Sequence, residues 1–178
     1  MTRKDAAAIR LLVLDVDGTL TDGHLYYGPR GEVLKVFHVR DGHGIKLLDA
    51  AGIEVAVISG RKSKMVDTRC RELGVRHVIQ GTQDKVPAFQ SLRKRLNIEV
   101  SQSACVGDDS PDVPLMKAVK LAFAVADAHP EALKAAHVVT SQPGGHGAVR
   151  EVCDYLLASR RVRAAVSRAR QPQKHKKR

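Results

Sequence analysis

The chain has 178 residues, which is enough to build one hydrophobic core and too few for two domains of ordinary size. Apolar residues make up 43% of it, which excludes a chain that is disordered throughout, and no apolar run approaches the ~20 residues that a membrane-spanning helix needs. The net charge of +11 is concentrated in residues 159–178, which hold nine basic and no acidic residues, so we expect a basic, disordered tail there and no specific nucleic-acid partner.

Short apolar strands alternate with amphipathic helical stretches, which is typical of an α/β domain with a parallel sheet. The expected strands, in chain order, are residues 11–16, 24–27, 32–39, 53–58, 77–80, 104–106, 122–125 and 137–139. The expected helices are residues 42–51, 63–73, 84–96, 111–118, 130–135 and 148–159. The second and third strands flank the four residues Gly28-Pro29-Arg30-Gly31, which predicts a β-hairpin with a four-residue turn.

Two aspartates mark the end of the first strand, in the segment DVDGT. Asp15 and Asp17 are separated by one residue, and Gly18 allows the chain to bend so that both carboxylates converge above the sheet edge. Neighbouring carboxylates raise each other's proton affinity unless a cation lies between them, and Mg²⁺ prefers carboxylate oxygens, water and phosphate. The pair therefore indicates a magnesium site, the alternative being that both side chains only cap the following turn.

Further polar residues follow the later strands. Ser59 and Gly60 offer a hydroxyl and backbone N–H groups that suit a phosphate oxygen, although Ser59 could equally cap the next helix. Lys85 begins a helix, where a positive charge is disfavoured, so a phosphate-facing role explains it better than a solvated side chain. The segment GDDSPD at 107–112 adds three carboxylates beside an apolar strand, which is costly unless a metal or another partner compensates.

Nothing in the cysteine pattern or at the N-terminus indicates an exported protein. The three cysteines are odd in number, widely spaced and outside any CxxC pair, so we expect neither a disulfide framework nor a zinc site. Residues 1–10 are polar and mixed where a secretory signal would be apolar. We therefore expect a cytoplasmic protein.

In this order and at strand ends, DVDGT, Ser59, Lys85 and GDDSPD resemble the four motifs of the haloacid dehalogenase superfamily. From Leu11 to Leu157 the chain further resembles the 3-deoxy-D-manno-octulosonate 8-phosphate phosphatases of that superfamily, in segments such as LLVLDVDGTLTDGHLYYGPRGEVLKVFHVRDGHGIKLL and GGHGAVREVCDYLL. The resemblance implies a Rossmann-like three-layer α/β/α domain over residues 1–158. Its sheet would be mostly parallel, with a β-hairpin after the first strand and no cap domain.

The resemblance also implies a role for each carboxylate. Asp15 would attack phosphorus and form an aspartyl-phosphate, and Asp17 would protonate the leaving group and then deprotonate the hydrolytic water. Mg²⁺ would be held by Asp15, the backbone carbonyl of Asp17, and Asp108. Asp109 and Asp112 would hold these ligands in place without binding the metal themselves.

The remaining site residues would bind the substrate. Ser59, the Gly60 backbone and Lys85 would neutralise the transferring phosphoryl oxygens. Arg61 would pair with the carboxylate of a sugar acid, the alternative being a surface arginine at a helix start. Related phosphatases that act on nonulosonate 9-phosphates tend to carry Glu at the position of Arg61, which favours the octulosonate for this chain.

The family resemblance implies a homotetramer assembled through the hairpin. A neighbouring subunit would partly cover each site, with the glycine-rich stretch Gly144–Gly147 approaching it; many family members carry Arg where this chain has His146. The implied reaction is the Mg²⁺-dependent hydrolysis of 3-deoxy-D-manno-octulosonate 8-phosphate in lipopolysaccharide precursor biosynthesis. Alternatives are a phosphatase for a nonulosonate 9-phosphate or another small phosphomonoester, a phospho-accepting receiver-like domain, and a non-catalytic protein whose tail binds RNA.

Overall fold

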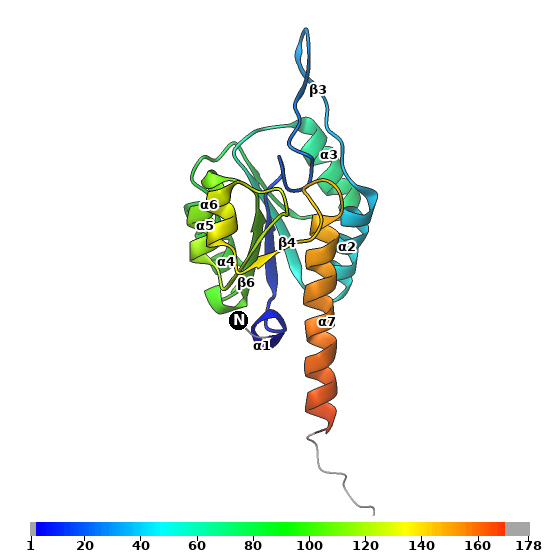
Figure 1. The fold of residues 1–178 in the computed structure, drawn as a ribbon, viewed down its shortest axis with the longest axis vertical. Helices are drawn as coiled ribbons and strands as arrows, with labels where there is room; N and C mark the ends of the chain where they lie inside the picture. Colours follow the sequence, from blue (N-terminus) through cyan, green and yellow to red (C-terminus); the bar gives the residue numbers. More distant parts are fainter. Residues whose placement is uncertain (1–2, 170–178) are drawn as a thin grey trace, which may run out of the picture.

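The computed structural model describes residues 3–169, in which helices cover both faces of a six-stranded sheet (Figure 1). The strand order is β5-β4-β1-β6-β7-β8, and all five neighbouring pairs are parallel, which confirms the expected parallel sheet. The strands are β1 (Leu11–Leu14), β4 (Glu54–Ser59), β5 (His77–Gln80), β6 (Ser103–Gly107), β7 (Leu121–Ala124) and β8 (Val138–Val139).

The helices form the two outer layers of the expected three-layer arrangement. One face is covered by α2 (Val39–Ala50), α3 (Lys64–Leu73) and α7 (Ala148–Ala169), with the short α1 (Arg3–Ala6) against α7. The other face is covered by α4 (Lys85–Arg95), α5 (Val113–Ala118) and α6 (Pro130–Ala135). Two 3₁₀ turns, η1 (Val100–Gln102) and η2 (Ser110–Asp112), flank β6.

The core is built mainly from short aliphatic side chains. The strands β1, β6 and β7 are buried along their whole length, as expected for parallel strands covered on both faces, and their sequences are almost continuously apolar. Phe89 and Phe123 are the largest fully buried side chains among the described residues, and Phe123 meets Tyr155 edge to face with the ring centres 5.6 Å apart. This apolar layer holds the strand ends rigidly beneath the polar edge described below.

A β-hairpin follows β1 and projects beyond the sheet edge (Figure 1). It consists of β2 (Tyr26–Gly28) and β3 (Gly31–Leu34), which pair antiparallel. Gly28 pairs with Gly31, so the turn consists of Pro29 and Arg30 and is shorter than the expected four residues. The third strand also ends earlier than expected, because the chain enters α2 at Val39. Among residues 3–169 no separate cap domain is present, as the resemblance implied.

The last helix is longer than the sequence suggested. We expected it to end at Ser159, but α7 continues to Ala169, so the expected disorder from residue 159 onward is wrong for 159–169, and residues 170–178 lie outside the described part of the chain. The segment 160–169 contains neither Gly nor Pro and is rich in Ala and Arg, which are strong helix formers. Within the described residues, no helix is long and apolar enough to cross a membrane.

Arg160 fixes α7 to the body of the domain. Its guanidinium donates hydrogen bonds to the carbonyl oxygens of Ala51, at 2.5 Å, and of Ile9, at 2.7 Å. These carbonyls belong to the end of α2 and the start of β1, so one side chain joins three segments. Charged hydrogen bonds to half-buried carbonyls are among the stronger ones in proteins.

We therefore expect Arg160→Met to lower the free energy of unfolding by about 1–2 kcal/mol, since the two carbonyls lose their donors. Urea unfolding followed by circular dichroism measures the change. Arg71→Met, on the exposed surface of α3, is the matched control and should shift the free energy by less than about 0.5 kcal/mol. Equal effects of the two substitutions would show that Arg160 does not anchor the helix.

Candidate active site

The topology of the sheet brings three polar strand ends together. The chain leaves β1 for β4 and β5 on one side and returns to β6 on the other, so β1 lies at the point where the strand order reverses. Ligands of open α/β sheets bind at the carboxyl ends of the strands at such a point. Asp15 follows β1, Ser59 ends β4, and Asp108 follows β6, so the polar residues that the sequence singled out meet at one edge.

Lys85 lies at the centre of this edge, as the first residue of α4. Its ammonium contacts Oδ1 of Asp15 and lies 2.6 Å from Oδ1 of Asp112, and all three side chains are buried. Burial alone would lower the pKa of Lys85, but the charges of Asp15 and Asp112 more than offset it and raise that pKa. The lysine is therefore a fixed positive charge beside the Asp15 carboxylate.

The loop after β6 is folded around Asp112. While Oδ1 of Asp112 faces Lys85, its Oδ2 accepts hydrogen bonds from the backbone N–H groups of Asp108, at 3.0 Å, and of Asp109, at 3.3 Å. A Cβ at Gly107 would lie about 2.5 Å from the Asp112 carboxyl carbon, so only glycine allows this approach. Both oxygens of Asp112 are thus engaged in holding the loop and the lysine.

Asp108 lies between this loop and the segment after β1. Its Oδ1 accepts a hydrogen bond from the Thr19 hydroxyl at 3.2 Å. Gly18 adopts a φ of +89°, and a Cβ there would overlap the Asp108 carboxylate, so the bend expected at Gly18 is also a close approach of two loops. Asp15 and Asp108 are in this way brought to face each other.

The cluster of Asp15, Asp108 and Asp112 has the composition of a divalent-cation site. One oxygen from each residue lies within 4.8 Å of the others. Burial, followed by the charge of Asp112, raises the pKa of Asp15 to about 7 although Lys85 opposes it. Burial, followed by the charges of Asp15 and Asp112, raises the pKa of Asp108 to about 8. Three carboxylates share one ammonium, so the cluster carries an excess of negative charge, and its hard oxygen donors fit Mg²⁺.

Asp17 takes a different direction from Asp15. Its Oδ1 contacts the Lys35 ammonium, and its Oδ2 lies 3.6 Å from Nε of Arg61. Its carboxylate is therefore outside the three-carboxylate cluster and faces the hairpin. Arg61 in turn donates a hydrogen bond to the Tyr27 hydroxyl at 2.9 Å and lies 3.5 Å from Glu32.

All nine residues predicted from the sequence line one open cleft of about 270 Å³. They are Asp15, Asp17, Ser59, Gly60, Arg61, Lys85, Asp108, Asp109 and Asp112. Ser59 is buried, and its Oγ accepts a hydrogen bond from the backbone N–H of Arg61 at 3.3 Å, which holds the turn after β4. The cleft is open to solvent and wide enough for a phosphorylated small molecule.

Sequence reasoning missed several residues at this site. Thr82 and Gln83 line the cleft beside Gly60, and nothing in their spacing distinguishes them from ordinary loop residues. Glu32 and Lys35 reach the site from the hairpin. A signal for Lys35 existed, because it interrupts the otherwise apolar run from Val33 to Phe37.

The glycine-rich stretch lies behind the site rather than in the cleft. The backbone N–H of Gly145 donates to the Thr19 carbonyl at 3.0 Å, and that of Gly144 donates to Asp127 at 2.9 Å. A Cβ at Gly144 would collide with the backbone of Gly18. The stretch therefore supports the loop after β1 of its own chain, while His146 is exposed.

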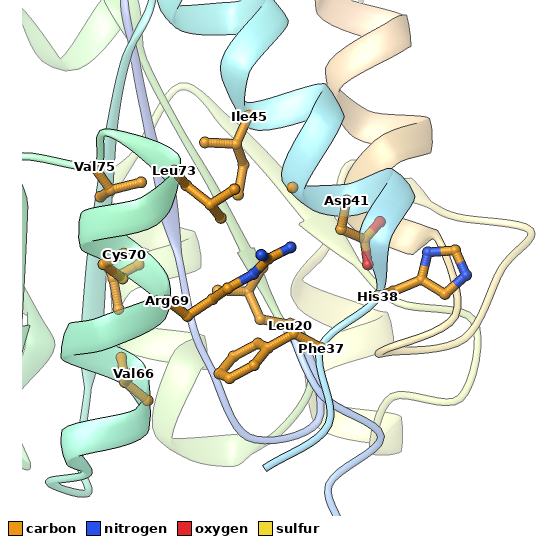
Figure 2. Close-up of a pocket in the computed structure, with 12 residues that line it drawn as sticks. Leu20, Phe37, His38, Asp41, Ile45, Val66, Arg69, Cys70, Leu73 and Val75 are labelled. Atoms are coloured by element: carbon orange, nitrogen blue, oxygen red, sulfur yellow. The ribbon is translucent and has the colours of Figure 1, made fainter.

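A second, narrow cavity of about 10 Å³ lies between α2 and α3 (Figure 2). Apolar side chains such as Leu20 and Phe37 line most of it, with Arg69 crossing from α3 and Asp41 at the start of α2. Asp41 accepts a hydrogen bond from the backbone N–H of Arg150 at 2.7 Å and so joins α2 to the first turn of α7. The cavity contains none of the predicted site residues and is too small for a substrate.

The chain is similar to known proteins over most of its length. Residues 76–152 match the haloacid dehalogenase-like hydrolases. The chain is 53% identical to the 3-deoxy-D-manno-octulosonate 8-phosphate phosphatase KdsC of Escherichia coli K12 over 152 residues, 85% of this chain and 81% of the relative.

Two crystal structures superpose closely on this chain. That of the 3-deoxy-D-manno-octulosonate 8-phosphate phosphatase from Yersinia pestis has a TM-score of 0.87 and 48% identity, covering 89% of this chain and 86% of that one. The second is that of the 3-deoxy-D-manno-octulosonate 8-phosphate phosphatase from Moraxella catarrhalis in complex with a magnesium ion, a phosphate ion and a KDO molecule. It has a TM-score of 0.87 and 39% identity, covering 95% of this chain and 97% of that one.

The raised pKa values predict a pH-dependent stability of the metal-free protein. Because Asp15 and Asp108 titrate near 7 and 8 in place of 3.8, the folded protein keeps protons that the unfolded chain has lost between about pH 4 and 8. Stability from these groups is therefore lost as the pH rises through that window. With EDTA present, we expect Asp108→Asn to gain stability relative to the wild type between pH 5 and pH 8.

Urea unfolding at both pH values measures this, with Asp109→Asn, in the same loop and half-exposed, as the matched control. Adding Mg²⁺ at pH 8 should stabilise the wild type more than Asp108→Asn. A difference between Asp108→Asn and wild type that stays constant with pH would contradict the charge excess at this cluster.

Proposed function

This chain belongs to the 3-deoxy-D-manno-octulosonate 8-phosphate phosphatases, a family of haloacid dehalogenase-like hydrolases, and we propose that it hydrolyses 3-deoxy-D-manno-octulosonate 8-phosphate to the free sugar acid and phosphate. The observation that carries the proposal is the buried Asp15 carboxylate, which faces Lys85 and Asp108 at the base of an open cleft. This arrangement offers a nucleophile, a fixed cation and a cation site to one phosphoryl group.

In the first half of the reaction, Asp15 attacks phosphorus in line with the leaving oxygen and becomes an aspartyl-phosphate. Asp17 gives a proton to the leaving sugar oxygen as the P–O bond breaks. In the second half, Asp17 takes a proton from a water molecule, which attacks the same phosphorus and releases phosphate and Asp15. The different directions of the two carboxylates support this division, since one faces the cluster and the other faces the hairpin side of the cleft.

The charges around the phosphoryl group are distributed over several residues. Lys85, the Ser59 hydroxyl and the Gly60 backbone face the cleft and neutralise the phosphoryl oxygens. Mg²⁺, held by Asp15, Asp108 and the backbone carbonyl of Asp17, supplies further positive charge to the transferring group when bound. The magnesium ion in the Moraxella catarrhalis structure supports this choice of metal. Asp109 and Asp112 hold the loop that carries Asp108.

Arg61 gives the site its preference for an acidic sugar. It lies at the rim of the cleft with its side chain 40% exposed, where a substrate carboxylate can reach its guanidinium. The KDO molecule in the Moraxella catarrhalis structure supports a sugar acid as the substrate. We place the reaction in the cytoplasm, in the supply of lipopolysaccharide precursors. A nonulosonate 9-phosphate is the alternative substrate of the same chemical class.

The substrate is tested by measuring kcat/KM for a panel of phosphate esters at saturating Mg²⁺. We expect 3-deoxy-D-manno-octulosonate 8-phosphate to exceed nonulosonate 9-phosphates and simple phosphomonoesters by at least about tenfold, because simple esters lack a carboxylate for Arg61 and the extra carbon of a nonulosonate changes the distance between its carboxylate and phosphate. Asp15→Asn should lower kcat by more than about 10³-fold with the fold retained.

Chelation should stop turnover, and added Mg²⁺ should restore it. If the octulosonate ester is no better than p-nitrophenyl phosphate, the substrate assignment fails. Near-normal turnover by Asp15→Asn, checked by circular dichroism for an intact fold, would instead contradict the mechanism.

The hairpin supports assembly into a homotetramer. Exposed large apolar side chains among the described residues gather in the hairpin segment (residues 25–39): Leu25, Tyr26, Tyr27, Val33, Leu34, Val36 and Val39. The segment projects beyond the sheet edge, and a two-stranded hairpin is marginally stable alone (Figure 1). An apolar surface of this kind marks a protein interface, and four copies meeting through their hairpins would cover it.

We expect Val33→Glu to reduce the mass measured by light scattering below that of a tetramer, because it places a charge in the apolar interface. Val139→Glu is the matched control, since Val139 is similarly exposed but lies on β8, away from the hairpin. A wild-type protein that is monomeric, or a Val33→Glu variant that keeps the wild-type mass, would refute assembly through the hairpin.

A further inference from the structure

In the hairpin segment a charged side chain is buried while neighbouring apolar side chains are exposed, which is the reverse of the usual arrangement. The Lys35 side chain is only 1% exposed, while its neighbours Leu34 and Val36 are 48% and 49% exposed. Lysine is among the residues least often buried, and it is buried only where partners compensate its charge. The segment therefore directs a lysine inward, toward the cleft, and its aliphatic residues outward.

Lys35 has two such partners. Its ammonium contacts Oδ1 of Asp17 and lies 3.1 Å from Oε1 of Glu32. The same Glu32 oxygen lies 3.5 Å from Nη2 of Arg61, whose Nε is 3.6 Å from Oδ2 of Asp17. The four side chains thus form a closed ring in which positive and negative charges alternate. We call it the charge ring.

The charge ring joins the hairpin to two loops that follow neighbouring strands of the sheet. Asp17 belongs to the loop after β1, Glu32 and Lys35 to the hairpin, and Arg61 to the turn after β4. Lys35 is the most buried of its four side chains, and Glu32 is the second carboxylate that holds the lysine. A carboxylate fixed through one oxygen has a defined direction for the other, which a freely rotating side chain lacks.

We propose that Lys35, held by Glu32, is a positioning residue that fixes the Asp17 carboxylate for proton transfer to the leaving oxygen. This inference rests on the proposed function, since it assumes the acid–base role of Asp17. Lys35 does not touch the phosphoryl group in this arrangement; Lys85 is the ammonium beside Asp15. Lys85 therefore contacts the nucleophile, and Lys35 contacts the acid–base residue.

The leaving group separates this role from a structural one. An alkyl phosphate needs a proton on its leaving oxygen, whereas p-nitrophenolate departs as a stabilised anion without one. In a reaction through a covalent intermediate, kcat/KM reports the steps up to departure of the leaving group and excludes hydrolysis of the aspartyl-phosphate. A substitution that misplaces the proton donor therefore lowers kcat/KM for alkyl esters and spares the aryl ester.

The experiment measures kcat/KM with Mg²⁺ for the octulosonate ester, β-glycerol phosphate and p-nitrophenyl phosphate. For Lys35→Met, which keeps the length of the side chain, we expect losses of about 10- to 100-fold on both alkyl esters and less than about threefold on the aryl ester. Lys35→Arg should recover part of the loss because it keeps the charge. Arg30→Met, which removes an exposed cation from the hairpin turn, is the matched control and should change none of the three values.

Each other result decides the question as well. Equal losses on all three esters overturn the proposal in favour of a structural role, and a loss confined to the octulosonate ester places the effect on Arg61 and also overturns it. If Lys35→Met changes the mass or the circular dichroism spectrum, Glu32→Gln decides by the same comparison of alkyl and aryl esters. If the wild type hydrolyses β-glycerol phosphate but not the octulosonate ester, the proposed substrate fails while the test of Lys35 stands.

Discussion

Negative charge gathered at the end of β1 is the constraint on which the rest of the site depends. Three buried or half-buried carboxylates, of Asp15, Asp108 and Asp112, face the single ammonium of Lys85. Burying unpaired charge is costly, so each oxygen that the lysine does not reach needs another donor. The backbone N–H groups after β6 supply two donors to Asp112, and Thr19 supplies one to Asp108. What remains is an excess of negative charge, which a divalent cation would offset.

In the charge ring, the carboxylates are compensated by side-chain cations. Asp17 and Glu32 face Lys35 and Arg61, two anions against two cations, so the ring is balanced without a metal. Asp15 and Asp17 are only one residue apart in the chain, yet their carboxylates end in these two different surroundings and do not converge as expected from the sequence. A nucleophile needs access to the phosphoryl group, and a proton donor needs a fixed direction. In the proposed mechanism, one short loop would meet both needs by sending its two carboxylates to different partners.

The sequence predicted the strand ends well because parallel strands of a buried sheet leave an unmistakable apolar pattern, and polar residues placed directly after them must meet at one edge. The sequence pattern alone therefore indicated that Asp15, Ser59, Lys85 and Asp108 lie close together. Side-chain direction in the hairpin could not be predicted in this way, because the burial of Lys35 depends on contacts with residues far away in the chain. The end of α7 was missed for a related reason: clustered positive charge suggested disorder, while local helix propensity favoured a longer helix.

The hairpin connects assembly to chemistry, because its two faces have different tasks. Its outward side chains, such as Val33 and Val36, form the apolar surface through which subunits would meet. Its inward side chains, Glu32 and Lys35, hold Asp17. The exposed Val33, Leu34 and Val36 lie in the same short segment as Glu32 and Lys35, so a shift that seats the outer residues against a neighbour also moves the inner ones relative to the cleft. A hairpin that is marginally stable alone gains a fixed position from its partners. In the proposed assembly, the hairpin and the charge ring would depend on each other: a neighbouring subunit would hold the strands, and the strands hold Asp17.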